Sequence, residues 1–200
     1  MMIKTRRRIG VDTDDVLVDF VGALIEHYNE TYGTDIKREQ VKNFSFHDIW
    51  GGTLEKRVER VNHFFETPYF DDILPIEGSQ EAINYLSLSN DLFIVTSRPI
   101  FIKEKTEKWL NKFFNGKFLG IVNSSNHYSK AKNSGKTKVQ LCNELGVSVL
   151  IDDSLDYIKQ CPSMGIKGIL FGDYPWNQNG NLPEGVVRVK NWNEALEELK

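Results

Sequence analysis

Short apolar segments rich in β-branched residues alternate with amphipathic helical segments along most of this sequence, and this alternation restricts the fold more than any other feature. The expected strands are 9–11, 91–96, 118–122, 148–151, 166–171 and 186–189. The expected helices of the same region are 79–87, 102–114, 138–145, 154–161 and 191–196. Strands that alternate with helices favour a parallel sheet with right-handed crossovers. We therefore predict an α/β fold with a doubly wound parallel sheet.

Residues 19–74 interrupt this alternation. Two helical patterns and an aromatic loop occupy the segment, at 20–32, 54–65 and 43–52 respectively. An all-helical insertion directly after the first strand would lie over the carboxyl ends of the strands, where open α/β sheets bind their ligands. We expect residues 1–18 and 75–200 to form the α/β core and residues 19–74 to form a small helical cap.

Composition limits the classes of partner. The 200 residues, 40% of them hydrophobic, are enough for one core with a modest insertion. A net charge of -3 lacks the basic footprint of a protein that binds duplex nucleic acid. No apolar run approaches the length of a bilayer span, and no apolar signal stretch follows the first basic residues. We expect a cytoplasmic protein with no membrane partner, and composition leaves its oligomeric state open.

Three carboxylates follow the first expected strand. Asp12, Asp14 and Asp15 come directly after the apolar residues 9–11. Like charges this close together repel one another and resist burial, so a fold keeps them only where water, a cation or hydrogen bonds offset the cost. The alternative to a functional site is a solvated turn after an edge strand. The residues at the other strand ends decide between the two.

Polar residues also end the second expected strand, follow the fourth, and open the helix between them. In chain order they are Thr96, Ser97, a lysine at position 136 or 138, Asp152 and Asp153. The carboxyl ends of parallel strands share one edge of the sheet, so we expect carboxylates, hydroxyls and an ammonium group in one crevice. This set suits phosphoryl transfer, because carboxylates hold Mg²⁺ and the cations neutralise phosphate oxygens.

With these motifs the sequence resembles the haloacid dehalogenase superfamily. Its phosphatases carry a strand-terminal Asp-x-Asp, a later Thr or Ser, a Lys and a late acidic pair. The stretches 12–20, 95–99 and 151–154 are most similar to the 5'(3')-deoxyribonucleotidase-like group and its bacterial nucleotidase-like relatives. The resemblance covers the whole chain and implies a Rossmann-like core with a cap after the first strand. One departure is Asp15, which stands where the superfamily usually has Gly, and its role stays open.

The resemblance implies roles for the carboxylates. Asp12 would be the nucleophile and a metal ligand. Asp14 would protonate the leaving oxygen and then activate water, while its main-chain carbonyl binds the metal. Asp153 would be the remaining metal ligand, with Asp152 behind it and Asp156 as a further carboxylate nearby. The implied cofactor is Mg²⁺.

The resemblance also implies the groups that bind phosphate. Thr96 would hold a phosphate oxygen, with Ser97 beside it. Lys138 would bridge the nucleophile and the phosphate, since it opens the helix that leads into the acidic strand. Lys136 is the reserve candidate for that lysine.

We expect the cap to determine the substrate. Phe20, Phe44 and Trp50 could stack on a nucleobase or another flat group, or they could pack the cap onto the core. Arg98, which follows the hydroxyl pair, could meet a phosphate or pair with a cap carboxylate such as Asp48.

These observations favour a Mg²⁺-dependent phosphomonoesterase that forms an aspartyl-phosphate and hydrolyses a small phosphorylated metabolite, with a small nucleotide as the favoured substrate, in the manner of a 5'-nucleotidase. One alternative is a phosphatase of a sugar phosphate or another small organophosphate. A second is a non-catalytic module that binds phosphorylated ligands, and the presence of Asp14 argues against it. The sequence leaves the physiological substrate and the preference for 5' or 3' phosphates open.

Overall fold

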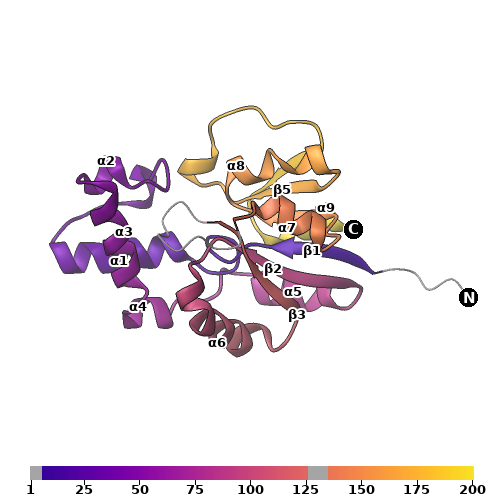
Figure 1. The fold of residues 1–200 in the computed structure, drawn as a ribbon, viewed down its shortest axis with the longest axis horizontal. Helices are drawn as coiled ribbons and strands as arrows, with labels where there is room; N and C mark the ends of the chain where they lie inside the picture. Colours follow the sequence, from indigo (N-terminus) through magenta and orange to yellow (C-terminus); the bar gives the residue numbers. More distant parts are fainter. Residues whose placement is uncertain (1–5, 126–134) are drawn as a thin grey trace, which may run out of the picture.

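The computed structural model describes residues 6–125 and 135–200, and their centre is a six-stranded sheet (Figure 1). Its order is β3-β2-β1-β4-β5-β6, and every neighbouring pair is parallel. The strands are β1 (Arg7–Val11), β2 (Asn90–Thr96), β3 (Phe118–Asn123), β4 (Val149–Asp152), β5 (Lys167–Phe171) and β6 (Val186–Val189). All six strands predicted from the sequence are confirmed, and so is the α/β class.

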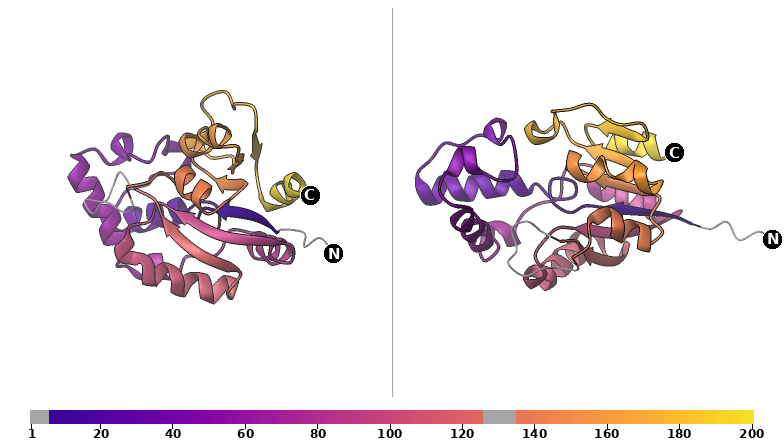
Figure 2. Two further views of the ribbon diagram at one scale, coloured as in Figure 1. Left: turned by 45° about the vertical axis from the view of Figure 1, so that its right-hand side comes forward. Right: turned by 45° about the horizontal axis from the view of Figure 1, so that its top comes forward.

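Helices cover both faces of this sheet (Figure 2). The helices of one face are α5 (Ser79–Ser87), α6 (Lys103–Phe114) and α9 (Trp192–Leu199), and those of the other are α7 (Lys138–Glu144) and α8 (Leu155–Ile158). Successive side chains of a strand point to opposite faces, so Ile151 packs in one apolar cluster and Leu150 in the other. This double burial explains why the strands are continuous apolar runs.

The segment between β1 and α5 is helical where it is regular. Its helices are α1 (Phe20–Tyr32), α2 (His47–Trp50), α3 (Leu54–Phe64) and α4 (Pro68–Asp71). In Figure 1 they lie beyond the carboxyl ends of the strands, on the far side from the N-terminus. The short helix α2 lies within the stretch that the sequence predicts as an aromatic loop, so that prediction is wrong for these four residues.

Single turns of 3₁₀ helix are a second feature absent from the prediction. They are η1 (Arg38–Gln40), η2 (Ile100–Ile102), η3 (Cys161–Met164) and η4 (Pro175–Asn177). Turns of three or four residues carry too little periodicity to be recognised in a sequence. The predicted helix 154–161 consists of α8 followed by η3, with a break at Lys159–Gln160.

Helix α1 has a capping residue at each end and a buried apolar face between them. The Asp19 side chain accepts a hydrogen bond from the main-chain N–H of Gly22 and so caps the first turn. Gly33 ends the helix with φ of 62°, a left-handed conformation that glycine adopts without strain. Between these residues, apolar side chains at helical spacing, including Leu24 and Tyr28, are buried.

The two ends of the helical segment meet at one place on the core. Val18, just before α1, forms a β-bridge with Pro75, just after α4. The adjacent main-chain N–H of Ile76 donates to the carbonyl of Leu17 at 2.8 Å. The chain therefore leaves the core and returns to it at neighbouring positions.

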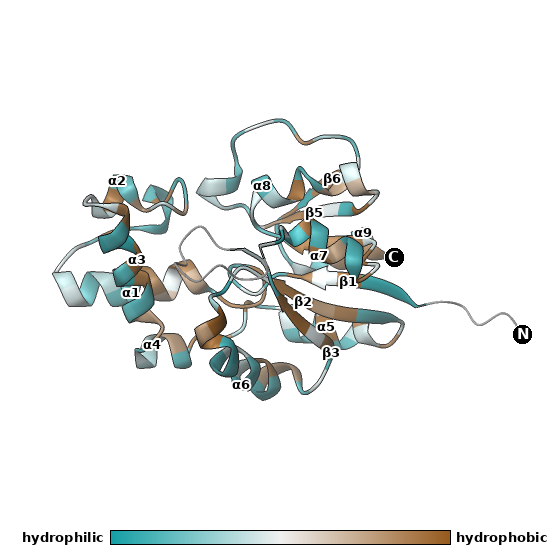
Figure 3. Cartoon of the chain, in the orientation of Figure 1, coloured by the Kyte–Doolittle hydropathy of each residue, from teal (hydrophilic) through white to brown (hydrophobic). Residues whose placement is uncertain are grey.

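The hydropathy of the residues differs between the buried sheet and the surface helices (Figure 3). Strand β2 is coloured hydrophobic over most of its length, while the surface helix α6 is largely hydrophilic. Among the residues that the structure describes, no helix has both the length and the apolar character needed to cross a membrane.

Candidate active site

A cavity of about 500 Å³ separates the strand ends from the helical segment. On the sheet side it is lined by residues that follow β1, β2 and β4, among them Asp12, Ser97 and Asp153. On the opposite side it is lined by aromatic residues of the helical segment, including Phe44 and Phe65. One end of the cavity is thus charged and the other apolar.

Lys138 lies at the centre of the charged end of the cavity. It is the first residue of α7, where the Thr137 side chain caps the helix by accepting from the main-chain N–H of Gln140. Its side chain is 1% exposed, and Nζ lies 2.8 Å from Asp12 Oδ2 and 2.7 Å from Asp152 Oδ2. Burial by itself would lower the pKa of Lys138, but the two carboxylates outweigh burial and raise it. The ammonium group is therefore charged at neutral pH.

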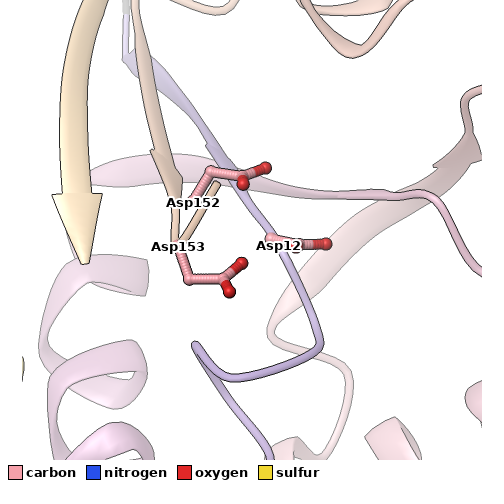
Figure 4. A group of neighbouring side chains, drawn as sticks. All are labelled: Asp12, Asp152 and Asp153. Atoms are coloured by element: carbon pink, nitrogen blue, oxygen red, sulfur yellow. The ribbon is translucent and has the colours of Figure 1, made fainter. Parts of the chain in front are cut away.

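Three buried carboxylates lie close together at this end of the cavity, and two of them contact Lys138. Oxygens of Asp12, Asp152 and Asp153 lie within 4.8 Å of one another (Figure 4). Burial is the main cause that raises the pKa of Asp12 to about 7, and the neighbouring carboxylates raise it further while Lys138 opposes the shift. Burial together with the other carboxylates also raises the pKa of Asp153 well above its usual range. The site carries more negative charge than Lys138 can neutralise.

The oxygen atoms of this group fit a divalent cation. Within the parts of the chain that the structure describes, Oδ1 of Asp12 is buried and has no hydrogen-bond partner. Asp152 is already engaged, because its two oxygens accept from Lys138 Nζ and from the main-chain N–H of Ser154. A hard cation such as Mg²⁺ prefers carboxylate oxygens, and it would satisfy Asp12 and reduce the repulsion with Asp153.

Asp14 points to a different partner. Arg98 Nη2 lies 2.6 Å from Asp14 Oδ1, and Nε lies 3.1 Å from both oxygens. Arg98 is itself buried, bonded to the Thr106 hydroxyl, with its guanidinium 5.0 Å from the centre of the Phe70 ring. The carboxylate that Arg98 pairs with is therefore Asp14, at the end of β1, whereas the sequence offers a phosphate or a cap carboxylate such as Asp48 as alternatives. The Arg98 guanidinium fixes the Asp14 carboxylate at the cavity wall.

The two hydroxyl residues at the end of β2 occupy different positions. Ser97 lines the cavity, and its Oγ contacts the hydroxyls of Ser124 at 2.9 Å and Tyr157 at 3.2 Å. Thr96 is fully buried behind it, where its hydroxyl accepts from the main-chain N–H of Arg98. Ser97 is thus the hydroxyl that the structure places in the cavity.

The structure separates the two candidate lysines. Lys138 is in the carboxylate cluster, whereas Lys136 lies on the surface, half exposed and paired with Glu144 at 2.7 Å. Asp156 is exposed and lines the cavity without belonging to the carboxylate group, so it is farther from the centre than Asp152. The sequence favours Lys138 without excluding Lys136, because both residues adjoin the start of α7.

Comparison with known families agrees with this geometry. The model of the family described as 5' nucleotidase, deoxy (pyrimidine), cytosolic type C protein (NT5C) matches residues 6–199. The chain belongs to the NT5C family. It accordingly belongs to the haloacid dehalogenase superfamily, as the motifs predict.

The chain is also similar to curated proteins, at low sequence identity. A protein of Staphylococcus epidermidis named "Putative 5'(3')-deoxyribonucleotidase" is 27% identical over 114 residues, which make up 55% of this chain. The match spans 61% of the length of that relative.

Solved structures share the fold at low identity. A haloacid dehalogenase-like hydrolase of Streptococcus pneumoniae superposes with a TM-score of 0.71 at 14% identity, covering 98% of this chain and 99% of the other. The magnesium-bound "putative HAD-hydrolase YfnB" of Bacillus subtilis gives a TM-score of 0.66 at 16% identity, covering 98% of this chain and 100% of the other. At these identities the superpositions establish the architecture alone.

Asp15 adopts a main-chain conformation that is usual for glycine. Its φ is 54°, in the left-handed region that glycine enters freely and aspartate tolerates. Its carboxylate is buried, accepts from the main-chain N–H of Val21, and lies 3.4 Å from Nη1 of Arg38. Burial raises the pKa of Asp15 well above its usual range, although Arg38 opposes the shift. Asp15 thus joins the base of α1 to η1.

The aromatic residues predicted to contact a substrate divide into two groups. Phe20 and Phe44 line the cavity of this NT5C-family protein. Trp50 does not, because it is stacked between Tyr28 and Phe46 at ring distances of 4.8 and 4.4 Å. The prediction that Trp50 contacts a substrate is corrected: its ring packs inside the helical segment.

Two cavity residues that contact the charged end, Trp176 and Tyr157, are not predicted from the sequence. Trp176, in η4, donates its indole N–H to Asp153 Oδ2 at 2.7 Å and contacts the Phe44 ring at 5.4 Å. Tyr157, in α8, reaches Ser97. Trp176 follows the carboxyl end of β5 and could have been found by applying the strand-end argument to that strand. No sequence signal distinguishes Tyr157 from the apolar residues around it.

Proposed function

We propose that this protein is a Mg²⁺-dependent phosphomonoesterase that forms an aspartyl-phosphate on Asp12 and acts on small nucleotides. The observation that carries the proposal is the Asp12 carboxylate itself. One oxygen is 2.8 Å from the Lys138 ammonium group, and the other, within the described part of the chain, is buried without a partner beside a cavity large enough for a nucleotide.

The reaction divides into two displacements. In the first, an Asp12 oxygen attacks phosphorus, the ester P–O bond breaks, and Asp14 gives its proton to the leaving oxygen. In the second, Asp14 takes a proton from water, the water oxygen attacks phosphorus, and the bond to Asp12 breaks to release inorganic phosphate. Arg98 orients the Asp14 side chain with two nitrogens, and after the first step it stabilises the carboxylate that then takes a proton from water.

The phosphate is held by groups already in place. The Lys138 ammonium group neutralises charge on the phosphate oxygens, and Asp152 keeps it in position from behind at 2.7 Å. Ser97 donates a hydrogen bond from the cavity wall, and Thr96 supports the same strand end. Preorganised donors of this kind need no rearrangement when charge develops in the transition state.

Asp12, Asp153 and the main-chain carbonyl of Asp14 would hold Mg²⁺. The bound ion supplies positive charge that neutralises phosphate oxygens. Asp153 is oriented for this task by the Trp176 indole, which occupies one of its two oxygens.

The helical segment, residues 19–74, is proposed as a cap over the core formed by residues 1–18 and 75–200. It supplies Phe20 and Phe44 to the cavity wall, so a flat apolar group can be enclosed opposite the charged end. A nucleoside monophosphate has the matching shape, with a planar base at one end and a phosphate at the other. The nucleotidase-like names of the relatives support the same substrate class.

The proposal is tested by phosphate release from a panel of nucleoside monophosphates, sugar phosphates and an aryl phosphate, with and without Mg²⁺. We expect nucleoside monophosphates to give the highest kcat/KM, and chelation to abolish turnover. Asp12→Asn should lower turnover by about 10⁴-fold or more on every substrate. Undiminished turnover in that variant would refute the nucleophile, whereas a preference for sugar phosphates would refute only the substrate class.

A further inference from the structure

Tyr157 contacts two of the phosphate-binding groups at once. Ser97 Oγ donates to its hydroxyl at 3.2 Å, and when Ser97 turns its one proton to a phosphate oxygen, the Tyr157 O–H can donate to Ser97 Oγ in return. The centre of its ring lies 4.7 Å from Nζ of Lys138, within the range of a cation–π contact. These two partners come from the end of β2 and the start of α7, so one side chain of α8 connects two other elements of the site.

From this geometry we infer that Tyr157 is a positioning residue that sets the locations of Lys138 and Ser97 for phosphate binding. The inference rests on the proposed function of those two residues. A lysine side chain has four rotatable bonds, and its ammonium group is a point charge that can be displaced. The carboxylates of Asp12 and Asp152 restrain Nζ from one set of directions, and the Tyr157 ring adds a restraint from another element.

The role of Tyr157 is separable from the packing of α8. Leu155 and Ile158 anchor this helix in the apolar cluster beneath the sheet and are 7% and 0% exposed. Tyr157 is only half-buried, lines the cavity, and does not belong to that cluster. Substitution of Tyr157 should therefore leave the helix and its core contacts in place.

Two variants separate the two contacts. Tyr157→Phe keeps the ring face against Lys138 and removes the hydroxyl, whereas Tyr157→Leu removes both. Tyr85→Leu is the matched control, because Tyr85 is 56% exposed on α5 and does not line the cavity. The first measurement is the calorimetric affinity for inorganic phosphate in the presence of Mg²⁺, and the second is kcat and KM on an aryl phosphate.

We expect Tyr157→Leu to weaken phosphate binding by about 10-fold, and Tyr157→Phe by about 3-fold, since a cation–π contact and a hydrogen bond each contribute modestly. The thermal midpoint should stay close to that of the unmodified protein in both variants. Because the Phe variant keeps the Lys138 contact, its partial recovery distinguishes positioning from a general loss of structure.

A double-mutant cycle with Ser97→Ala sharpens the test. In the Ser97→Ala background, Tyr157→Phe should cause no further loss of phosphate affinity, because the hydrogen bond is already absent. Tyr157→Leu should still cause a loss through Lys138.

The inference is overturned if Tyr157→Leu binds phosphate within about 2-fold of the unmodified protein, or if Tyr85→Leu weakens binding equally. Failure of the proposed function has a different signature. If no substrate in the panel is turned over, the calorimetric phosphate affinities of the variants still decide whether Tyr157 positions the site.

Discussion

The two ends of the cavity are built in different ways. At the charged end the sheet fixes the side chains: the main-chain N–H of Asp12 continues the ladder by donating to Ile151 O at 2.9 Å, and Asp152 is the last residue of β4. At the aromatic end the positions depend on side-chain packing within the helical segment. Phe44 lies between η1 and α2, outside any helix or strand, and Phe46 has a positive φ of 52°.

This difference assigns separate tasks to the two ends. A hydrogen-bonded sheet holds charged groups to within fractions of an ångström, which phosphoryl transfer requires. A surface made from loops and short helices can change its shape without disturbing the sheet. We therefore expect substitutions at the charged end to affect turnover on all substrates, and substitutions at the aromatic end to depend on the substrate.

After the loss of the nucleophile Asp12, the largest expected effect is at Lys138. Lys138→Met removes the only cation that contacts both Asp12 and Asp152 among the described residues, so kcat/KM should fall by about 10²- to 10³-fold on nucleotide and aryl phosphates alike. Lys136→Met is the control, because Lys136 pairs with Glu144 on the surface. Steady-state kinetics of both variants measure the contrast, and a loss confined to one substrate would contradict it.

An intermediate effect is expected at the aromatic end. Phe44→Ala should lower kcat/KM for a nucleoside monophosphate by about 10-fold, while an aryl phosphate, which cannot span the cavity, should be affected less than 3-fold. The measurement is the ratio of the two kcat/KM values in each variant. An equal loss on both substrates would mean that Phe44 acts only through packing.

Trp50→Ala is the matched comparison. Trp50 is stacked between two rings and lies outside the cavity, so its loss should destabilise the fold by about 3 kcal/mol without altering substrate preference in the protein that remains folded. For a chain of this size the midpoint of thermal unfolding should fall by about 6–12 °C. A changed substrate ratio would place Trp50 in recognition after all.

How much the sequence predicts also differs between the two ends. Asp12, Ser97, Lys138 and Asp153 could be found because each adjoins a strand end or opens a helix, and parallel strands bring such positions to one edge. The six strands were recognisable for the related reason that both faces of the sheet are buried, which leaves uninterrupted apolar runs.

The aromatic end has no such rule. Phe44 and Trp50 both stand in one aromatic stretch, yet one lines the cavity and the other packs between Tyr28 and Phe46. Which ring faces outward depends on the turn that α2 introduces, and four residues of helix leave no recognisable pattern. The ion pair of Arg98 with Asp14 is likewise a contact across 84 positions of sequence, which spacing cannot reveal.

The smallest effect concerns stability and has the opposite sign to that of Trp50. Asp153→Asn should raise the thermal midpoint of the metal-free protein by about 3 °C at pH 8, because it removes one buried charge from the cluster of three carboxylates. Asn retains an oxygen that can accept from the Trp176 indole.

The stability advantage of Asp153→Asn should depend on pH. Burial and the neighbouring carboxylates raise the pKa of Asp153 in the folded state above its unfolded value, so the folded protein binds more protons and loses stability as pH rises through that interval. The advantage of Asp153→Asn should therefore vanish near pH 4 and grow toward pH 8. Thermal unfolding with a chelator measures it, Mg²⁺ should reduce it, and a constant difference across pH would contradict the charge argument.

The bridge between Val18 and Pro75 has a consequence for how such proteins can diversify. Because the chain leaves the core and returns to it at neighbouring residues, the two ends of the intervening segment stay next to each other whatever the length of that segment. Lengthening that segment costs little, since the entropy of closure grows only slowly with the number of residues. The same catalytic sheet can therefore carry helical segments of different size, and each replacement would exchange the aromatic wall while Asp12 and Lys138 keep their places.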